Sequence, residues 1–212
     1  MAKNLNPKCK QCRRIGEKLI LKSDRCNSPK CAMVKKNYPP GAHGSKRPGK
    51  KSDYALQLTE KQKAKKQYNI LEKQFKLTFK RAEKQKGNTG ENLLKLLETR
   101  FDNVIYCLKF AQSKSQARQL VNHGHFIINN HKVDIPSYQV KTGDIIKIKE
   151  QSKKNKIFKQ LLEKLSKQNK IDIPSWIYLD PKELTGKILY EPSINNIQTN
   201  INSQIIVEYY SK

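Results

Sequence analysis

The fold class is decided by residues 116–135, whose sequence is QARQLVNHGHFIINNHKVDI. Serines just upstream can cap a helix that runs to about residue 123. Residues 126–128 and 132–135 are rich in branched apolar side chains, and Asn129-Asn130 between them accepts the left-handed backbone of a two-residue turn. An alternating strand over residues 145–149 follows. The pattern predicts an α+β protein in which a short helix docks on a small sheet.

Helices are expected before this module, over residues 52–68, 71–86, from 89 or 90 onward, and 101–108. In the second of them Leu71, Phe75, Phe79 and Ala82 recur at helical spacing and form an apolar stripe. In the first, several lysines are expected to be exposed, namely Lys61, Lys63, Lys65 and Lys66.

The sequence after the module is less regular. Residues 153–170 are expected to form a Lys-rich helix, and irregular β structure is expected from Pro174 onward. The apolar run over residues 204–210 is expected to form a final strand. Residues 1–50 are rich in Cys, Pro, Gly and Lys, which argues against long helices there.

The charge balance restricts the function classes. Lys and Arg number 44 against 18 Asp and Glu, a formal net charge of +26, and most of the excess lies in the first hundred residues. Such a chain repels itself unless a polyanion neutralises it. No apolar run approaches the ~20 residues of a membrane span. The polar start Met1–Cys9 lacks the apolar core of a signal peptide, so a reducing compartment is expected. A nucleic acid is the favoured partner.

Four of the five cysteines fall near the N-terminus. Cys9 and Cys12 form a C-x-x-C pair, and Cys26 and Cys31 follow with four residues between them. This spacing can bring four thiolates onto one tetrahedral ion, so a structural zinc site is predicted, with an iron–sulfur cluster as the alternative. Disulfides are disfavoured in a reducing compartment. Cys107, which lies between apolar residues, is interpreted as a buried thiol.

The helix upstream of the hairpin carries a polar stripe. Lys114, Arg118 and Asn122 recur at i, i+4 and i+8, and we expect this stripe on the outer face of the module, where it can contact RNA phosphates and 2′-hydroxyls. An ordinary amphipathic helix would show the same stripe. Asp102 is interpreted as a helix or salt-bridge residue.

Several longer motifs resemble one family. They are LETRFDNV at 97–104, QARQLVNHGH at 116–125, VDIPSY at 133–138, YPPGAHG at 38–44 and IVEYYS at 206–211. Together they are similar to small-subunit ribosomal protein four in its bacterial form. The resemblance runs from about Cys9 to the end and is thinnest across residues 150–203. The four cysteines stand where the zinc-bearing version of that family keeps its metal ligands.

The resemblance implies a function, partners and a cellular location for the chain. It implies a structural constituent of the small ribosomal subunit that binds the 5′ domain of the small-subunit rRNA and nucleates assembly. It also implies contacts with neighbouring proteins, including protein five, and with mRNA near its entrance, with an influence on decoding accuracy. The expected location is the cytoplasm of a bacterium, or an organellar ribosome. No membrane and no small-molecule substrate is expected.

The resemblance also suggests the domain organisation. A metal-knuckle basic extension is expected over 1–50, a helical domain over 51–97 completed by 188–212, and an RNA-binding module with its extension over 98–187, with its core at 98–150. The RNA-binding residues expected are Arg13, Arg14, Lys35, Lys36, His43, Lys46, Arg47, Lys61, Lys65, Arg100, Lys114, Arg118, Gln119, Asn122, His123, His125, Lys132, Tyr138 and Lys141.

An enzyme is the main competing class. The sequence has no P-loop, no Gly-x-Ser-x-Gly and no catalytic metal motif. Some pseudouridine synthases carry a similar module, and Arg100-Phe101-Asp102 superficially matches their catalytic stretch. In those enzymes the catalytic domain follows the module, and about sixty residues after Glu150 are too few for one. The prediction is therefore a non-catalytic protein, with a free-standing RNA chaperone or translational repressor as a further class.

Overall fold

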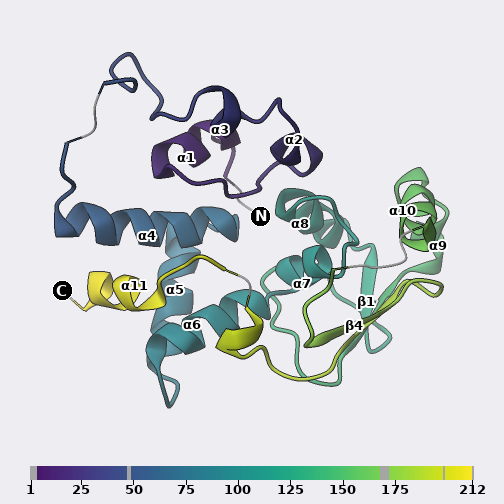
Figure 1. Ribbon diagram of the computed structural model, residues 1–212. Coiled ribbons are helices and arrows are strands. Elements are labelled where there is room, and N and C mark those ends of the chain that lie inside the picture. Colours follow the sequence, from purple (N-terminus) through teal and green to yellow (C-terminus); the bar gives the residue numbers. More distant parts are fainter. Residues whose placement is uncertain (1–3, 47–48, 168–171, 198, 212) are drawn as a thin grey trace. The chain divides into compact units, whose positions relative to one another are not determined.

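A computed structural model describes residues 4–46, 49–167, 172–197 and 199–211 (Figure 1). The chain divides into two compact units. The first, here called the N-terminal unit, comprises Met1–Leu93 with Thr199–Lys212, and the second, the central unit, comprises Leu94–Gln198. We expected residues 1–50 as a separate extension and residues 188–212 as one segment; the structure joins 1–50 to the helical unit and divides 188–212 at residue 198.

The N-terminal unit is helical. Its elements are α1 (Lys8–Ile15), α2 (Asp24–Asn27), α3 (Ala32–Lys35), α4 (Asp53–Gln67), α5 (Glu72–Glu83), the start of α6 (Thr89–Glu98) and α11 (Ser203–Tyr210). Ser52 caps α4, since its side chain accepts a hydrogen bond from the backbone N–H of Ala55 at 3.3 Å. The apolar stripe predicted for α5 is confirmed in part: Phe75, Phe79 and Ala82 are buried, whereas Leu71, at the N-cap position of the helix, is 36% exposed.

The predicted final strand is wrong, because residues 203–210 form the helix α11. Asn202 caps it, accepting hydrogen bonds from the backbone N–H groups of Gln204 and Ile205 at 3.1 and 3.3 Å. Packing outweighs the strand propensity of the Ile-Ile-Val run: Ile206 is fully buried, and the ring centroid of Tyr210 lies 4.4 Å from that of Phe79. Figure 1 shows α11, in yellow, beside α4, with which it is in contact.

The predicted exposure of Lys61 and Lys63 on α4 is also wrong, since both are buried. The ammonium of Lys63 pairs with Glu17 at 2.8 Å and Glu60 at 3.3 Å, and it donates to the carbonyl of Asn200. Lys63 therefore ties α4 to residues that precede and follow it by a long way in the sequence, and those partners allow an ammonium to be buried.

The central unit combines helices with one sheet. Its elements are the end of α6, then α7 (Phe101–Cys107), α8 (Lys114–Asn122), β1 (Phe126–Ile128), β2 (His131–Lys132), β3 (Ile145–Ile148), α9 (Glu150–Lys153), α10 (Lys156–Lys167), β4 (Ile177–Asp180), β5 (Thr185–Ile188) and the 3₁₀ turn η1 (Ile194–Asn196). Of the helix expected over 153–170, α10 provides most; residues 168–170 lie outside the described residues. The β structure expected from Pro174 is a regular hairpin, β4–β5.

The five strands are ordered β2-β1-β3-β5-β4, and every neighbouring pair is antiparallel. The predicted turn between β1 and β2 is confirmed, with φ of 46° at Asn129 and 69° at Asn130. The Asn129 side chain also fixes the turn, accepting from the N–H of Ile145 at 2.9 Å and donating to Asp144 at 2.8 Å.

One face of this sheet meets the helices. A continuous buried core joins side chains of the helices to inward-facing side chains of the strands. The helices α7, α8 and α10 contribute Phe101, Val121 and Phe158, and the strands contribute Phe126 and Ile146 among others. The predicted arrangement of a short helix on a small sheet is confirmed. Within the part of the chain that the structure describes, no helix is long and apolar enough to cross a membrane.

Candidate nucleic-acid interface

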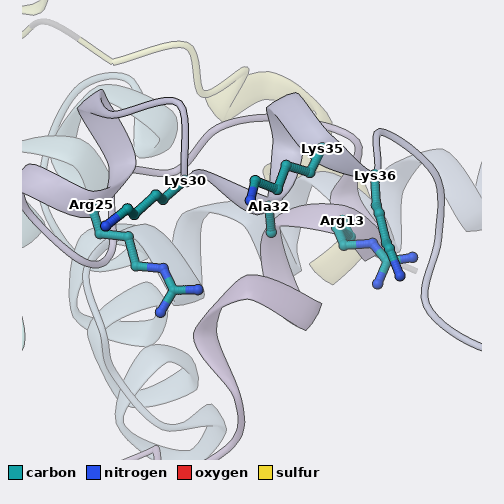
Figure 2. Close-up of a pocket in the computed structure, with 6 residues that line it drawn as sticks. All are labelled: Arg13, Arg25, Lys30, Ala32, Lys35 and Lys36. Atoms are coloured by element: carbon teal, nitrogen blue, oxygen red, sulfur yellow. The ribbon is translucent and has the colours of Figure 1, made fainter.

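The N-terminal unit contains a basic pocket of about 320 Å³, formed where α1, α2 and α3 meet. Its lining residues, which define the basic pocket, are Arg13, Arg25, Lys30, Ala32, Lys35 and Lys36. In Figure 2 the side chains of Arg25 and Lys30 lie at one end, Arg13 and Lys36 at the other, and Lys35 between them. Five cations around one depression, with no carboxylate in its lining, make a site for an anion such as a phosphate.

Backbone contacts hold Arg13 in this pocket. Its Nε donates to the carbonyl of Tyr38 at 2.9 Å, and Nη2 donates to that of Pro39 at 3.2 Å. The guanidinium carbon lies 4.8 Å from the centre of the Tyr38 ring, a cation–π distance. The segment Tyr38–Gly44, one of the motifs quoted above, thus orients a cation in the basic pocket.

Sequence reasoning identified Arg13, Lys35 and Lys36 but missed Arg25 and Lys30. Each missed residue directly precedes a cysteine, Cys26 or Cys31. Because these two cysteines line one cavity, the preceding cations are brought together as well. The cysteine spacing was therefore the signal that could have found them. Three further predicted residues, Arg14, His43 and Lys46, are exposed, and Arg47 lies outside the described residues.

The four N-terminal cysteines line one cavity of about 20 Å³. All are free thiols; Cys12 and Cys31 are buried, and Cys9 and Cys26 are half-buried. Burial raises the pKa of the Cys12 thiol, a hydrogen bond from the Leu19 backbone lowers it, and charge on the other three cysteines raises it further. Across the described ranges, no three Cys, His, Asp or Glu side chains form a group able to hold a metal ion. The shared cavity fits the predicted donor set, but metal-binding geometry is not formed.

In the central unit α8 presents part of the predicted stripe. Ser113 caps it, its hydroxyl accepting from the Gln116 N–H at 3.2 Å. Gln119, Asn122 and His123 are exposed. Lys114 is half-buried, with its ammonium 5.6 Å from the centre of the Tyr106 ring. These exposed amide and imidazole groups offer donors and acceptors to a polar ligand.

Arg118 does not belong to this exposed surface, so its predicted place on the outer face is wrong. It is 7% exposed, and Nη1 lies 3.4 Å from Oδ2 of Asp102. Arg100 is 1% exposed and pairs with the same carboxylate, Nη2 to Oδ2 at 2.9 Å and Nε to Oδ1 at 3.1 Å. Burial lowers the pKa of Arg118, while Asp102 raises it. The predicted salt-bridge role of Asp102 is confirmed.

His125 is half-buried, and its Nδ1 lies 2.9 Å from the hydroxyl of Ser152. Burial lowers its pKa, and the charges of His123 and Lys149 lower it further, so the neutral imidazole is favoured near pH 7. Lys132, Tyr138 and Lys141 are exposed, and the ammonium of Lys132 lies 3.6 Å from a carboxylate oxygen of Asp134.

Lys61 and Lys65 face one carboxylate of their own unit. Their ammonium groups lie 2.6 and 2.8 Å from Glu72 oxygens. Burial raises the pKa of Glu72, but hydrogen bonds from Lys61 and Lys65 lower it, and the net shift is downward. Tyr210 also donates to Glu72 at 3.3 Å. These two lysines hold α4, α5 and α11 together, and their ammonium groups are already paired within the chain.

Comparison with known proteins agrees with this division of the chain. The family model of the ribosomal protein S4/S9 N-terminal domain matches residues 3–98, and that of the S4 domain matches residues 99–146. The fold and the matches define the class: a chain that joins these two domains.

Relatives match over nearly the whole length. The small ribosomal subunit protein uS4 of Syntrophomonas wolfei is 50% identical over 204 residues, 96% of either chain. That of Trichlorobacter lovleyi is 50% identical over all 212 residues of both chains, as is uS4A of Alkaliphilus metalliredigens. The chain belongs to the uS4 family.

Proposed function

We propose that this chain is a structural, non-catalytic constituent of the small ribosomal subunit in the cytoplasm, where it binds the small-subunit rRNA directly. The observation that carries this proposal is the identity of about half of all positions, over essentially the full length, with relatives named small ribosomal subunit protein uS4. The net charge of +26 supports it, because rRNA supplies the neutralising polyanion.

Exposed and buried cations have different roles in RNA binding. The exposed ones, above all Arg25, Lys30, Lys35 and Lys36 of the basic pocket, are available to rRNA phosphates. The buried ones, Arg100 and Arg118 with Asp102, fix α7 against α8 and so orient the exposed Gln119 and Asn122. We also propose the more specific roles that the resemblance implies. They are binding to the 5′ domain of the rRNA, contacts with protein five and with mRNA near its entrance, and influences on assembly and decoding accuracy.

Sedimentation tests the assignment to the subunit. A tagged copy of the chain, expressed in cells, is expected to co-migrate with small ribosomal subunits in a sucrose gradient at physiological magnesium. Treatment of the lysate with ribonuclease should shift it to the top. A chain that sediments alone in the untreated lysate would contradict the proposal.

Charge reversal tests the basic pocket. The triple variant Arg25→Glu, Lys35→Glu, Lys36→Glu is expected to bind rRNA more weakly and to show a shallower salt dependence, by about one log–log unit for each phosphate that is no longer neutralised. A matched control at the C-terminal end of α5 and its cap, Lys80→Glu, Arg81→Glu, Lys84→Glu, changes the net charge equally at exposed positions. Equal losses in the two variants would show that only the net charge matters.

We further propose that Cys9, Cys12, Cys26 and Cys31 bind zinc. Four free thiols on one cavity support this, and zinc favours such a donor set. The ion would be structural, since four thiolates leave no open position. It would hold α1 to α3 in a segment with a small local core, in which Leu21 and Met33 pack against Cys12, Ile15 and Leu19. It would thereby fix the cations of the basic pocket.

Metal analysis tests the zinc site. Purified protein is expected to carry one zinc per chain by mass spectrometry of the elements, and Cys26→Ser to lose it and to become protease-sensitive within residues 4–46. Cys107→Ser is the matched control and should keep the zinc. Visible absorbance with stoichiometric iron would point instead to the iron–sulfur alternative, and wild-type protein without either metal would reject the site.

A further inference from the structure

The register of the sheet in the central unit defines two rows of side chains on the face opposite the core. In the first, Lys132 pairs with Ile127, Ile127 with Lys147, Lys147 with Thr185 and Thr185 with Asp180. In the second, Ile145 pairs with Lys187 and Lys187 with Tyr178. Because directly paired residues project from the same side of a sheet, these eight side chains share one face, here called the outer sheet face.

The opposite face is buried by the fold except at the edge strand β2, where His131 is exposed. Its residues, among them Phe126, Ile146, Ile148, Leu179 and Ile188, join the core with α7, α8 and α10. The outer sheet face differs sharply. Tyr178 is 57% exposed and Ile145 is 40% exposed, although both have residue types that normally gain from burial. A sheet face that leaves an aromatic ring and a branched aliphatic side chain in water is a candidate contact surface.

The positive charge on the outer sheet face indicates a negatively charged partner. Lys132, Lys147 and Lys187 are exposed on it. Asp180, at the end of one row, is the one carboxylate among the eight paired positions, and Asp134, outside the rows, lies 3.6 Å from Lys132. Lys132 and Lys147 are two strands apart, about 10 Å, and Lys147 and Lys187 lie on adjacent strands two residues apart, about 8 Å. Cations at this spacing, with an exposed aromatic ring in the neighbouring row, fit a polyanion that also offers flat apolar surfaces.

We propose that the outer sheet face binds a single-stranded segment of RNA, with a base stacked on Tyr178 and phosphates held by Lys147 and Lys187. Single strands offer both features, since their unstacked bases are free to lie on aromatic side chains while the backbone follows basic groups. An acidic protein segment could pair with the lysines as well, but it offers a flat group only at particular residues, whereas every nucleotide of a single strand carries both a base and a phosphate. The inference rests on the proposed RNA-binding function and extends it to a face of the central unit distinct from the basic pocket and from the exposed surface of α8.

Paired substitutions in the full-length chain test this assignment, with fluorescein-labelled decauridine as the probe at ~150 mM salt. Tyr178→Ala is expected to weaken binding of decauridine about tenfold. Tyr178→Phe, which keeps a stacking ring, should bind like the wild type. Tyr190→Ala removes another exposed tyrosine, outside the two rows, and should change little. Lys187→Gln is expected to lower the salt slope, whereas Lys182→Gln, in the turn between β4 and β5, should not.

Binding of every variant to a folded transcript of the rRNA 5′ domain separates the two proposals. Wild-type protein that binds the transcript but not decauridine would overturn the outer sheet face as a single-strand site and leave the proposed function standing. Failure to bind either RNA would overturn both. Equal decauridine binding by Tyr178→Ala and wild type would also overturn the inference, and capture of a polyglutamate peptide by the wild type but not by Lys187→Gln would then assign the face to an acidic protein.

Discussion

Arg118 of α8 and Asp102 of α7 form a buried ion pair, with Nη1 3.4 Å from Oδ2. The same carboxylate accepts two hydrogen bonds from Arg100, so one negative charge holds two guanidinium groups away from water. The pair links α7 to α8, two helices that carry parts of the longest family motifs. Arg100 and Arg118, which we expected to contact RNA directly, are therefore buried residues that support the helices of the central unit.

Asp102→Ala is therefore expected to destabilise the protein strongly. Loss of the carboxylate removes the ion pairs that it makes with two buried guanidinium groups, those of Arg100 and Arg118, at a cost of about 3–5 kcal/mol. Urea unfolding followed by circular dichroism measures the change. Lys109→Ala, at an exposed position just after α7, is the control and should change stability by less than about 0.5 kcal/mol. Normal stability of Asp102→Ala would refute the supporting role of the buried network.

The lowered pKa of Glu72 predicts that the N-terminal unit loses folding stability at acid pH. The folded-state pKa of this residue is lowered from the ordinary value of 4.5 because, although burial raises it, Lys61 and Lys65 hydrogen-bond to the carboxylate. A lowered folded pKa means that the stabilisation is present above pH 4.5 and is lost as the pH falls through the folded pKa. Since Glu72 is 45% exposed, water screens the pair, and Glu72→Gln should cost about 1 kcal/mol at pH 7.

Thermal unfolding measured from pH 7 to pH 3 tests whether the stabilisation by Glu72 is lost toward acid pH. The stability difference between wild type and Glu72→Gln is expected to shrink below pH 4.5, as the wild-type carboxylate becomes protonated. Glu83→Gln, at an exposed position on the same helix, is the matched control. A difference that grows toward acid pH would contradict the assignment.

Cys107 is expected to be the least reactive thiol. Burial raises its pKa to about 12, with a further contribution from the charge of Glu98, so almost no thiolate is present at pH 8. Cys107 is half-buried, as Cys9 and Cys26 are, so its raised pKa rather than its exposure sets it apart from them. After chelation of any metal, a thiol-specific reagent such as Ellman's should therefore modify Cys9 and Cys26 before Cys107. If Cys107→Ser removes a fast-reacting thiol rather than the slow one, the environment deduced for this residue is wrong.

The hairpin asparagines should respond differently to substitution. Asn130→Gly keeps the left-handed backbone and should leave stability unchanged or slightly raised. Asn129→Ala should be destabilising by about 1–3 kcal/mol, because it strains a positive φ and removes two hydrogen bonds, to Ile145 and Asp144. Urea unfolding of the two variants distinguishes these effects, and equal losses would show that the turn depends on backbone conformation alone.

Local patterns predicted the elements that depend on local physics. The stripe ending at Ala82 and the Asn129-Asn130 turn follow from spacing and backbone preference, and both are present in the structure. The helix α11 was missed because a run such as Ile205-Ile206-Val207 has the same apolar character in a strand and in a buried helix. Its helical state depends on distant residues of α4 and α5, which no local window contains.

The binding surface was predictable only in part, for a similar reason. A lysine or arginine at helical spacing indicates a face but not its partner, and the partners of Lys61 and Arg118 are Glu72 and Asp102, 11 and 16 residues away. Composition fixed the sign of the ligand's charge, since +26 demands a polyanion. Which cations remain exposed for that ligand depends on the tertiary fold.

The most direct test of the central claim is the equilibrium binding of the purified chain to a transcript of the rRNA 5′ domain over a range of salt concentrations. We expect binding at physiological ionic strength and a steep linear fall of log affinity with log salt, because about 6–10 phosphates are neutralised. No binding at that ionic strength, or an affinity that does not change with salt, would contradict the central claim.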